Sequence, residues 1–174
     1  MAEQSNDDMR LYLSEMTAIG QMCERGDCDG MVKSIREHYG KLGLFSSASD
    51  FLRMISVARS CRSDKEELSD VIRTIGFEAL LVVSLRENKA VPDVIASQVE
   101  LYKLKNRRYG NSFAECFAID GLPYAFGHLQ EKANRICSLL TIDDEAKEEP
   151  ILDSYKDLMG YCILTLVEVA KQSS

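Results

Sequence analysis

The chain has 174 residues, which is enough for one domain with a sizeable hydrophobic core. Hydrophobic residues make up 45% of the sequence and charged residues 28%, a balance typical of a globular protein. The net charge of −7 argues against duplex nucleic acid as a partner, since proteins that bind duplexes usually carry a basic surface. Acidic proteins still bind nucleotides when their basic groups are concentrated locally or a metal ion bridges the charges.

Targeting signals and cysteines limit where such a protein works. The first eight residues are polar and acidic, which argues against a signal peptide and predicts a frayed tail. The longest apolar run, Ala79 to Leu85, is far shorter than the roughly 20 residues that span a bilayer, so no membrane partner is expected. Six cysteines occur without a Cys-x-x-Cys pair, which predicts a reducing cytoplasm and no zinc site.

Apolar residues recur at helical spacing along the chain, and no segment alternates as a strand does. We therefore predict an all-α fold, a bundle of about seven helices in a single domain of residues 1–174. The apolar stripes run over 9–23, 31–42, 51–61, 68–83, 94–102, 122–140 and 151–169. The stripe over 68–83 is the most apolar, which predicts a central helix, and Ser63 to Glu66 has the capping-box pattern before it. Residues 111–120 are predicted to form a loop.

Basic side chains gather just before Gly110. Lys103, Lys105, Arg107 and Arg108 lie within six residues. Lysine binds phosphate as a point charge and arginine as a bidentate fork, so this cluster is suited to a phosphate group. The alternative is a basic helix C-terminus, stabilised by the helix dipole and closed by a glycine.

That alternative does not explain the polar and aromatic residues beside the cluster. Asn106 and Asn111 carry amides that could read the edge of a base, and Tyr109 and Phe113 carry rings that could stack on it. We therefore predict that this segment binds a nucleotide.

A second basic set follows in the next helix. His128, Lys132 and Arg135 are spaced to share one helical face, and Lys132 and Arg135 are suited to neutralising phosphate charge. Glu131 is a candidate metal ligand. The alternative is an ion pair between Glu131 and Arg135 on a solvated surface.

The last helix carries an acidic set. Asp153 and Asp157 are four residues apart, and Glu149 precedes Asp153 by four. Side chains at that spacing project along one helical face at neighbouring turns. Mg²⁺ prefers oxygen ligands and keeps several waters, so two carboxylates and the phosphates of a substrate suffice to hold it. The alternative is a solvated acidic face near a helix N-terminus, and Pro150 indicates that Glu149 caps the helix.

These clusters together resemble a known family. The matching features are Lys-Asn-x-x-Tyr-Gly-Asn-Ser-Phe at 105–113, Leu-x-x-Lys-x-x-Arg at 129–135 and Asp-x-x-x-Asp-Leu-x-x-Tyr at 153–161. Their order is similar to that of the phage-associated nucleotide modification associated domain, type 1 family. This family is related to the all-α MazG-like nucleotide pyrophosphohydrolases. The resemblance covers roughly the last third of the chain.

The resemblance implies a phage-type nucleotide-binding protein that works in the host cytoplasm and assembles as a homo-oligomer. It implies a MazG-like core over residues 91–172 and magnesium-dependent hydrolysis or modification of nucleotides. Residues 1–90 match no motif and are expected to form a subunit interface or close over the site. The acidic set is incomplete, because Arg135 stands where these hydrolases carry a second acid beside Glu131. Two alternatives stay open, a binder that sequesters a nucleotide or nucleotide-derived signal without turnover, and a helical protein–protein interaction module.

Overall fold

The computed structural model describes residues 2–24, 48–142 and 148–172, and all regular elements in these residues are helices. They are α1 (Ala2–Glu24), α3 (Ala48–Ser60), α4 (Lys65–Glu87), α5 (Val91–Tyr109), α6 (Ser112–Asp120), α7 (Leu122–Leu140) and α8 (Glu148–Lys171). The predicted all-α bundle is therefore confirmed. The helix predicted over 31–42 lies outside the described residues.

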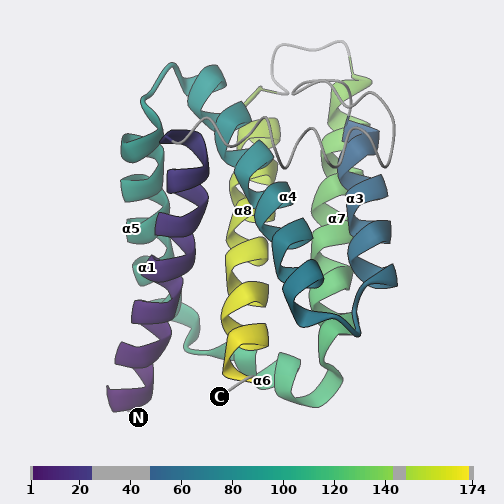
Figure 1. Cartoon of the computed structure of the whole chain (residues 1–174). Coiled ribbons are helices and arrows are strands. Elements are labelled where there is room, and N and C mark those ends of the chain that lie inside the picture. The colour runs from purple at the N-terminus through teal and green to yellow at the C-terminus, as the bar shows by residue number, and fades with distance from the viewer. Residues whose placement is uncertain (1, 25–47, 143–147, 173–174) are drawn as a thin grey trace.

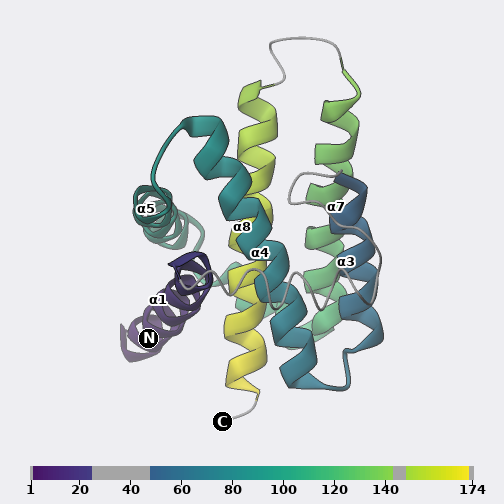
Figure 2. The same cartoon turned by 45° about the horizontal axis from the view of Figure 1, so that its top comes forward.

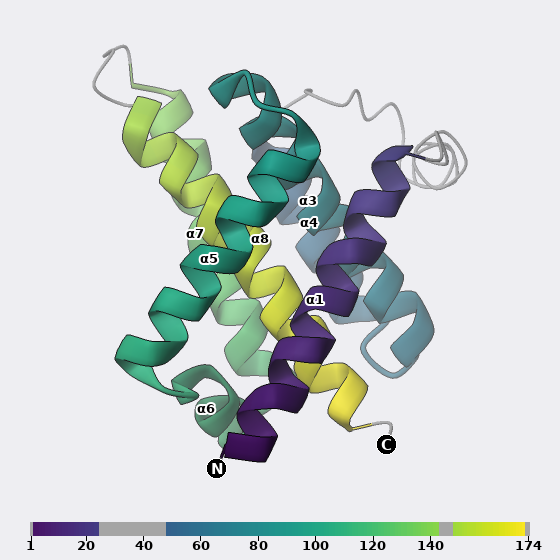
Figure 3. The same ribbon diagram turned by 90° about the vertical axis from the view of Figure 1, so that its left-hand side faces the viewer.

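The helices form two groups around the pair of α4 and α8. Figure 1 shows α3 and α7 on one side of this pair and α1 and α5 on the other. Turning the molecule shows the same division, with α1 and α5 on one face of α8 (Figures 2 and 3). The short α6 lies at one end, in contact with α7 and α8. Because α1 and α5 lie on the same face of α8, side chains from residues 2–24 and 91–109 meet there.

The core runs along α4, as its apolar stripe predicts. Leu68, Ile72, Ile75, Leu80 and Val83 are each 1% exposed or less. Burying one such side chain contributes about 1.5–3 kcal/mol relative to leaving it in water. The partners of this stripe are α8, α3, α1 and α5, so α4 holds both helix groups together.

The N-terminal tail and the 111–120 loop were wrong predictions. Helix α1 begins at Ala2, and the Asp8 side chain is buried against Lys171 at the end of α8. Residues Ser112–Asp120 form α6, which buries Phe113 and Phe117 in a small cluster of its own. In both cases burial against residues distant in the sequence stabilises a helix that the local sequence does not predict.

Two helix starts also differ from prediction. Asp64 caps α4 in place of Ser63, because its carboxylate accepts hydrogen bonds from the backbone N–H groups of Glu66 and Glu67 at 3.0 Å. Helix α8 begins at Glu148, so Glu149 is not its cap. Pro150 is tolerated in the first turn because N–H groups there have no partner within the helix.

Two further observations concern membrane-spanning helices and the cysteines. Within residues 2–24, 48–142 and 148–172, no helix combines the length and the apolar character required to cross a lipid bilayer. Cys61, Cys116, Cys137 and Cys162 are free thiols. Cys162 is fully buried on α8, where it packs as a small hydrophobic residue, and burial raises the pKa of its thiol.

Candidate functional site

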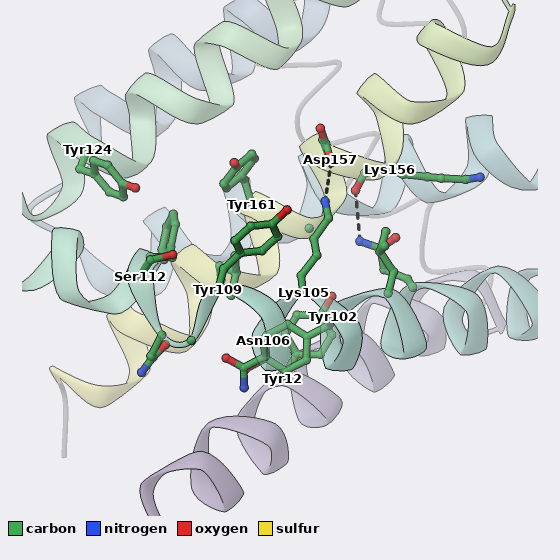
Figure 4. Close-up of a pocket in the computed structure, with 17 residues that line it drawn as sticks. Tyr12, Tyr102, Lys105, Asn106, Tyr109, Ser112, Tyr124, Lys156, Asp157 and Tyr161 are labelled. Atoms are coloured by element: carbon green, nitrogen blue, oxygen red, sulfur yellow. Dashed lines mark hydrogen bonds and ion pairs between the residues drawn. The ribbon is translucent and has the colours of Figure 1, made fainter. Parts of the chain in front are cut away.

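A pocket of about 320 Å³ lies between α1, α5, α6, α7 and α8 (Figure 4). Helix α5 supplies one wall through Gln98, Leu101, Tyr102, Lys105 and Tyr109. These residues recur every three or four positions, so they share one face of the helix. The volume is at the lower end of the range for small-molecule sites, which suits a ligand the size of one nucleoside or mononucleotide.

Helix α8 supplies the opposite wall, and a glycine lets the two walls come close. Gly160 lines the pocket, and a Cβ atom at this position would lie 3.0 Å from Nε2 of Gln98. Gln98 is buried and donates a hydrogen bond of 3.1 Å to the backbone carbonyl of Lys156 on α8. A glycine at 160 therefore keeps the space in which Gln98 joins α5 to α8.

Helix α1 closes a third side. The Tyr12 ring stacks on Tyr102 with ring centroids 3.8 Å apart and an angle of 13° between the planes. The Asn111 amide, which lines the pocket, donates a hydrogen bond of 3.0 Å to the Asp8 carboxylate. The half of the chain without recognised motifs thus contributes Tyr12 to the pocket wall.

One end of the pocket is aromatic. Phe113 lies 5.4 Å from Tyr124 and 5.9 Å from Tyr161, measured between ring centroids. Behind Tyr161, the His128 ring stacks at 4.4 Å and 12°. Burial raises the pKa of Tyr161, and burial with a hydrogen bond to Cys116 raises the pKa of Tyr124 to about 12. Both phenols therefore stay neutral at pH 7, and the rings present an uncharged surface on which a flat heterocycle can stack.

Next to Tyr161, three charged side chains from α5, α7 and α8 form a linked set. Lys105 Nζ lies 2.9 Å from Oδ1 of Asp157, and Lys132 Nζ lies 3.3 Å from Oδ2 of the same carboxylate. Figure 4 shows Lys105 reaching across from α5 to Asp157 on α8. Lys132, from α7, also pairs with Glu131 at 3.3 Å. Both oxygens of Asp157 are thus engaged by ammonium groups.

The residues predicted to bind a nucleotide separate into three groups in the structure. Those that line the pocket are Lys105, Asn106, Tyr109, Asn111 and Phe113. His128 and Lys132 lie behind the wall, where they contact Tyr161 and Asp157. Arg108 is exposed on α5 and is not among the pocket-lining residues, and Arg135 is exposed on α7.

The predicted metal ligands do not form a metal site in this arrangement. Asp157 is held by two lysines, Asp153 is exposed one turn earlier, and Glu131 is paired with Lys132. The side chain of Glu149 lies outside the described residues. Across the part of the chain that the structure describes, no three His, Cys, Asp or Glu side chains form a group able to hold a metal ion. The described carboxylates therefore do not make a Mg²⁺ site by themselves, the magnesium prediction stays a prediction, and no step of the function below depends on it.

Several pocket residues were missed from sequence. They are Tyr12, Gln98, Tyr102, Tyr124, Gly160 and Tyr161. The α5 residues among them have a readable signal, since Gln98 and Tyr102 continue the face that carries Lys105 back along the helix. Tyr161 stands within a matching motif without an assigned role. Tyr12 has no local signal, because only the tertiary packing of α1 brings it to the site.

The stacked His128 makes a prediction about pH. Burial lowers its pKa below the ordinary value of 6.5, Glu131 opposes this shift, and Lys132 adds to it. The unfolded chain therefore takes up this proton at higher pH than the folded protein does. The stability contributed by neutral His128 is present above about pH 6.5 and is lost as pH falls through the lower folded pKa.

The variant His128→Phe keeps a flat ring on Tyr161 but does not titrate. We expect it to lose less stability than wild type between pH 7.5 and 5.5. These two values bracket the normal histidine pKa of about 6.5. Urea unfolding at the two pH values checks this. An equal loss in both proteins would show that folding does not shift the pKa of His128.

The comparisons with known proteins found no relative of this chain. No protein-family model matches the chain, and neither a curated protein nor a solved structure is similar to it. The resemblance in the three motifs therefore stays a prediction, and the geometry of the pocket alone supports the function proposed next.

Proposed function

We propose that this protein binds a nucleotide or a nucleotide-derived small molecule in the pocket between α1, α5, α6, α7 and α8. The observation that supports the proposal is the set of side chains that line this pocket. It combines aromatic rings, amide side chains and a half-exposed lysine in one pocket.

The aromatic end supports a place for the base. Stacking of a base on an aromatic ring contributes about 1–3 kcal/mol and tolerates any base, because every base has a π-face. The rings of Tyr109, Phe113, Tyr124 and Tyr161 border this end. The Asn106 amide offers both donors and an acceptor, which suits the edge of a base.

The charged end supports a place for the phosphate. Lys105 is 51% exposed at its side chain although it pairs with Asp157, so an anionic group can reach its ammonium. Arg108 follows three residues later, and its exposed guanidinium is a second candidate partner for the phosphate. A ligand with its base among the rings would thus have a partner for its phosphate in Lys105.

The same geometry favours binding over hydrolysis. A magnesium-dependent hydrolase needs carboxylates free to hold the ion, whereas both oxygens of Asp157 face lysines. Hydrolysis, nucleotide modification, phage origin, a cytoplasmic location and self-association stay predictions from the sequence motifs. The proposed binder would sequester or sense its ligand without turnover.

A panel of nucleosides, nucleotides and dinucleotides, each with and without Mg²⁺, tests the proposal. The readouts are thermal shift and release of inorganic phosphate. A shift without phosphate release supports the binder, and release that requires Mg²⁺ supports the predicted hydrolase. Absence of any shift or release across the panel would contradict the proposed function and leave the interaction module.

A double variant tests the phosphate end. We expect Lys105→Ala with Arg108→Ala to weaken nucleotide binding at least tenfold, because charge-assisted hydrogen bonds contribute about 1.5–3 kcal/mol each. Exposed substitutions of this kind change stability by about 0.5 kcal/mol or less. Isothermal titration calorimetry measures the affinity.

The matched control is Lys103→Ala with Arg107→Ala, which removes the same charge from the same helix. Lys103 pairs with Glu100, and neither Lys103 nor Arg107 lies among the pocket-lining residues. Equal losses of affinity in the two double variants would show that only the overall charge of α5 matters.

A further inference from the structure

The two lysines that share Asp157 differ in how firmly they are held. The Lys105 side chain is 51% exposed, and its ammonium pairs with Asp157 Oδ1 at 2.9 Å. The Lys132 side chain is only 11% exposed and lies between Asp157 and Glu131. Its ammonium also lies 5.9 Å from the centre of the Tyr161 ring. Lys105 is therefore free to turn into the pocket, whereas Lys132 is fixed in the wall.

We propose that Lys105 is a transferable cation that leaves Asp157 for a phosphate group of the ligand, while Lys132 acts as a positioning residue that keeps Asp157 neutralised. This inference rests on the proposed function and refines it. It assigns the ligand class as a mononucleotide with its phosphate at Lys105. It also gives Lys132 a role that requires no contact with the ligand.

The charges explain why two lysines are needed. If Asp157 had Lys105 as its single partner, a phosphate would have to break that pair and leave a carboxylate unpaired beside the incoming negative charge. A half-buried charge without a partner is costly, and like charges at such distances repel each other. Because Lys132 pairs with Oδ2, Asp157 keeps a counter-ion when Lys105 moves to the phosphate. The exchange therefore leaves neither Asp157 nor Lys105 without an oppositely charged partner.

The state of Lys132 is consistent with this role. Burial lowers the pKa of its ammonium, but the charges and hydrogen bonds of Asp157 and Glu131 outweigh burial and raise the pKa above its ordinary value. Lys132 therefore stays charged at neutral pH and remains a counter-ion throughout the exchange. Its second partner, Glu131, is 61% exposed at its side chain and solvated, so Glu131 competes weakly for the ammonium.

The test compares nucleosides with their 5′-monophosphates by isothermal titration calorimetry in the absence of Mg²⁺. The four common nucleosides and their monophosphates are the probes, and the measured quantity is the ratio of the two dissociation constants. In wild type we expect the monophosphate to bind at least tenfold more tightly. Lys105→Met should lower the ratio toward one, because the transferable cation is lost.

Lys132→Met should also reduce the ratio, because Lys105 is then the one remaining partner of Asp157. Adding Asp157→Asn to that variant should restore the ratio, because the neutral amide releases Lys105. A direct contact between Lys132 and the phosphate predicts no such recovery. The proposal is overturned if Lys132→Met keeps the wild-type ratio or if the double variant does not recover.

If Lys132→Met fails to fold, the single variant Asp157→Asn tests the proposal. We expect it to raise the ratio above that of wild type, since Lys105 is free in advance, and an unchanged or lower ratio overturns the proposal. If wild type binds nucleosides and monophosphates equally, the proposed function stands and this inference falls. If wild type binds neither, both are overturned.

Discussion

Replacing Ile75 with alanine is expected to lower the free energy of unfolding by about 2–5 kcal/mol, the range for deleting a large buried aliphatic side chain. Ile75 is fully buried in the middle of α4, the helix that joins the two groups of helices. Its loss removes apolar burial and leaves a cavity that the four neighbouring helices cannot fully close. Urea unfolding followed by circular dichroism measures the change.

Leu85→Ala is the matched control on the same helix. Leu85 is 62% exposed, so its truncation removes a side chain of equal size without a cavity. We expect a change of about 0.5 kcal/mol or less. If both variants lost the same stability, the central position of α4 would be wrong.

Asp8→Asn is expected to lower the free energy of unfolding by about 1–3 kcal/mol, because it leaves charged and polar groups without their buried partner. Asp8 is 5% exposed, pairs with Lys171 and accepts a hydrogen bond from Asn111 at 3.0 Å. Burial lowers the pKa of Lys171, but its hydrogen bonds and charge interactions with Asp8 and Glu168 outweigh burial and raise the pKa. Thermal and urea unfolding check the expected loss.

The neighbouring residue supplies the control. Asp7 is 71% exposed at its side chain and pairs with Arg10 at a distance of 3.9 Å, so Asp7→Asn should have little effect on stability. Because Asn111 lines the pocket, Asp8→Asn should also weaken ligand binding, whereas Asp7→Asn should not. Equal stability of the two variants would argue that α1 begins after Asp8, as the sequence alone predicts.

The accuracy of the sequence predictions follows the strength of the local signal. Helix α4 was placed at the centre correctly because its long apolar stripe is wide enough to indicate burial on several sides. Helix α6 was missed because it spans nine residues and is stabilised through Phe113 and Phe117, whose partners come from other helices. A helix this short has little stability by itself, so its sequence carries little information about it.

The site was predictable along one helix but not across helices. Lys105 and Tyr109 are one turn apart, and the segment around them was predicted to bind a ligand from residue types; the structure shows that both residues line one pocket. The pairing of Asp157 with two lysines was not, because Lys105 and Lys132 come from different helices and their meeting depends on tertiary packing. In the structure Asp157 is the partner of two lysines, whereas the sequence alone predicted a metal ligand at this position.

The aromatic composition of the pocket gives the protein an optical signal of its own. The sequence has no tryptophan and 7 tyrosines, and Tyr12, Tyr102, Tyr109, Tyr124 and Tyr161 all line the pocket. Without tryptophan to accept their excitation energy, these phenols dominate the ultraviolet emission of the chain. A heterocycle that stacks among them would quench that emission, so occupancy of the pocket can be followed in unlabelled protein.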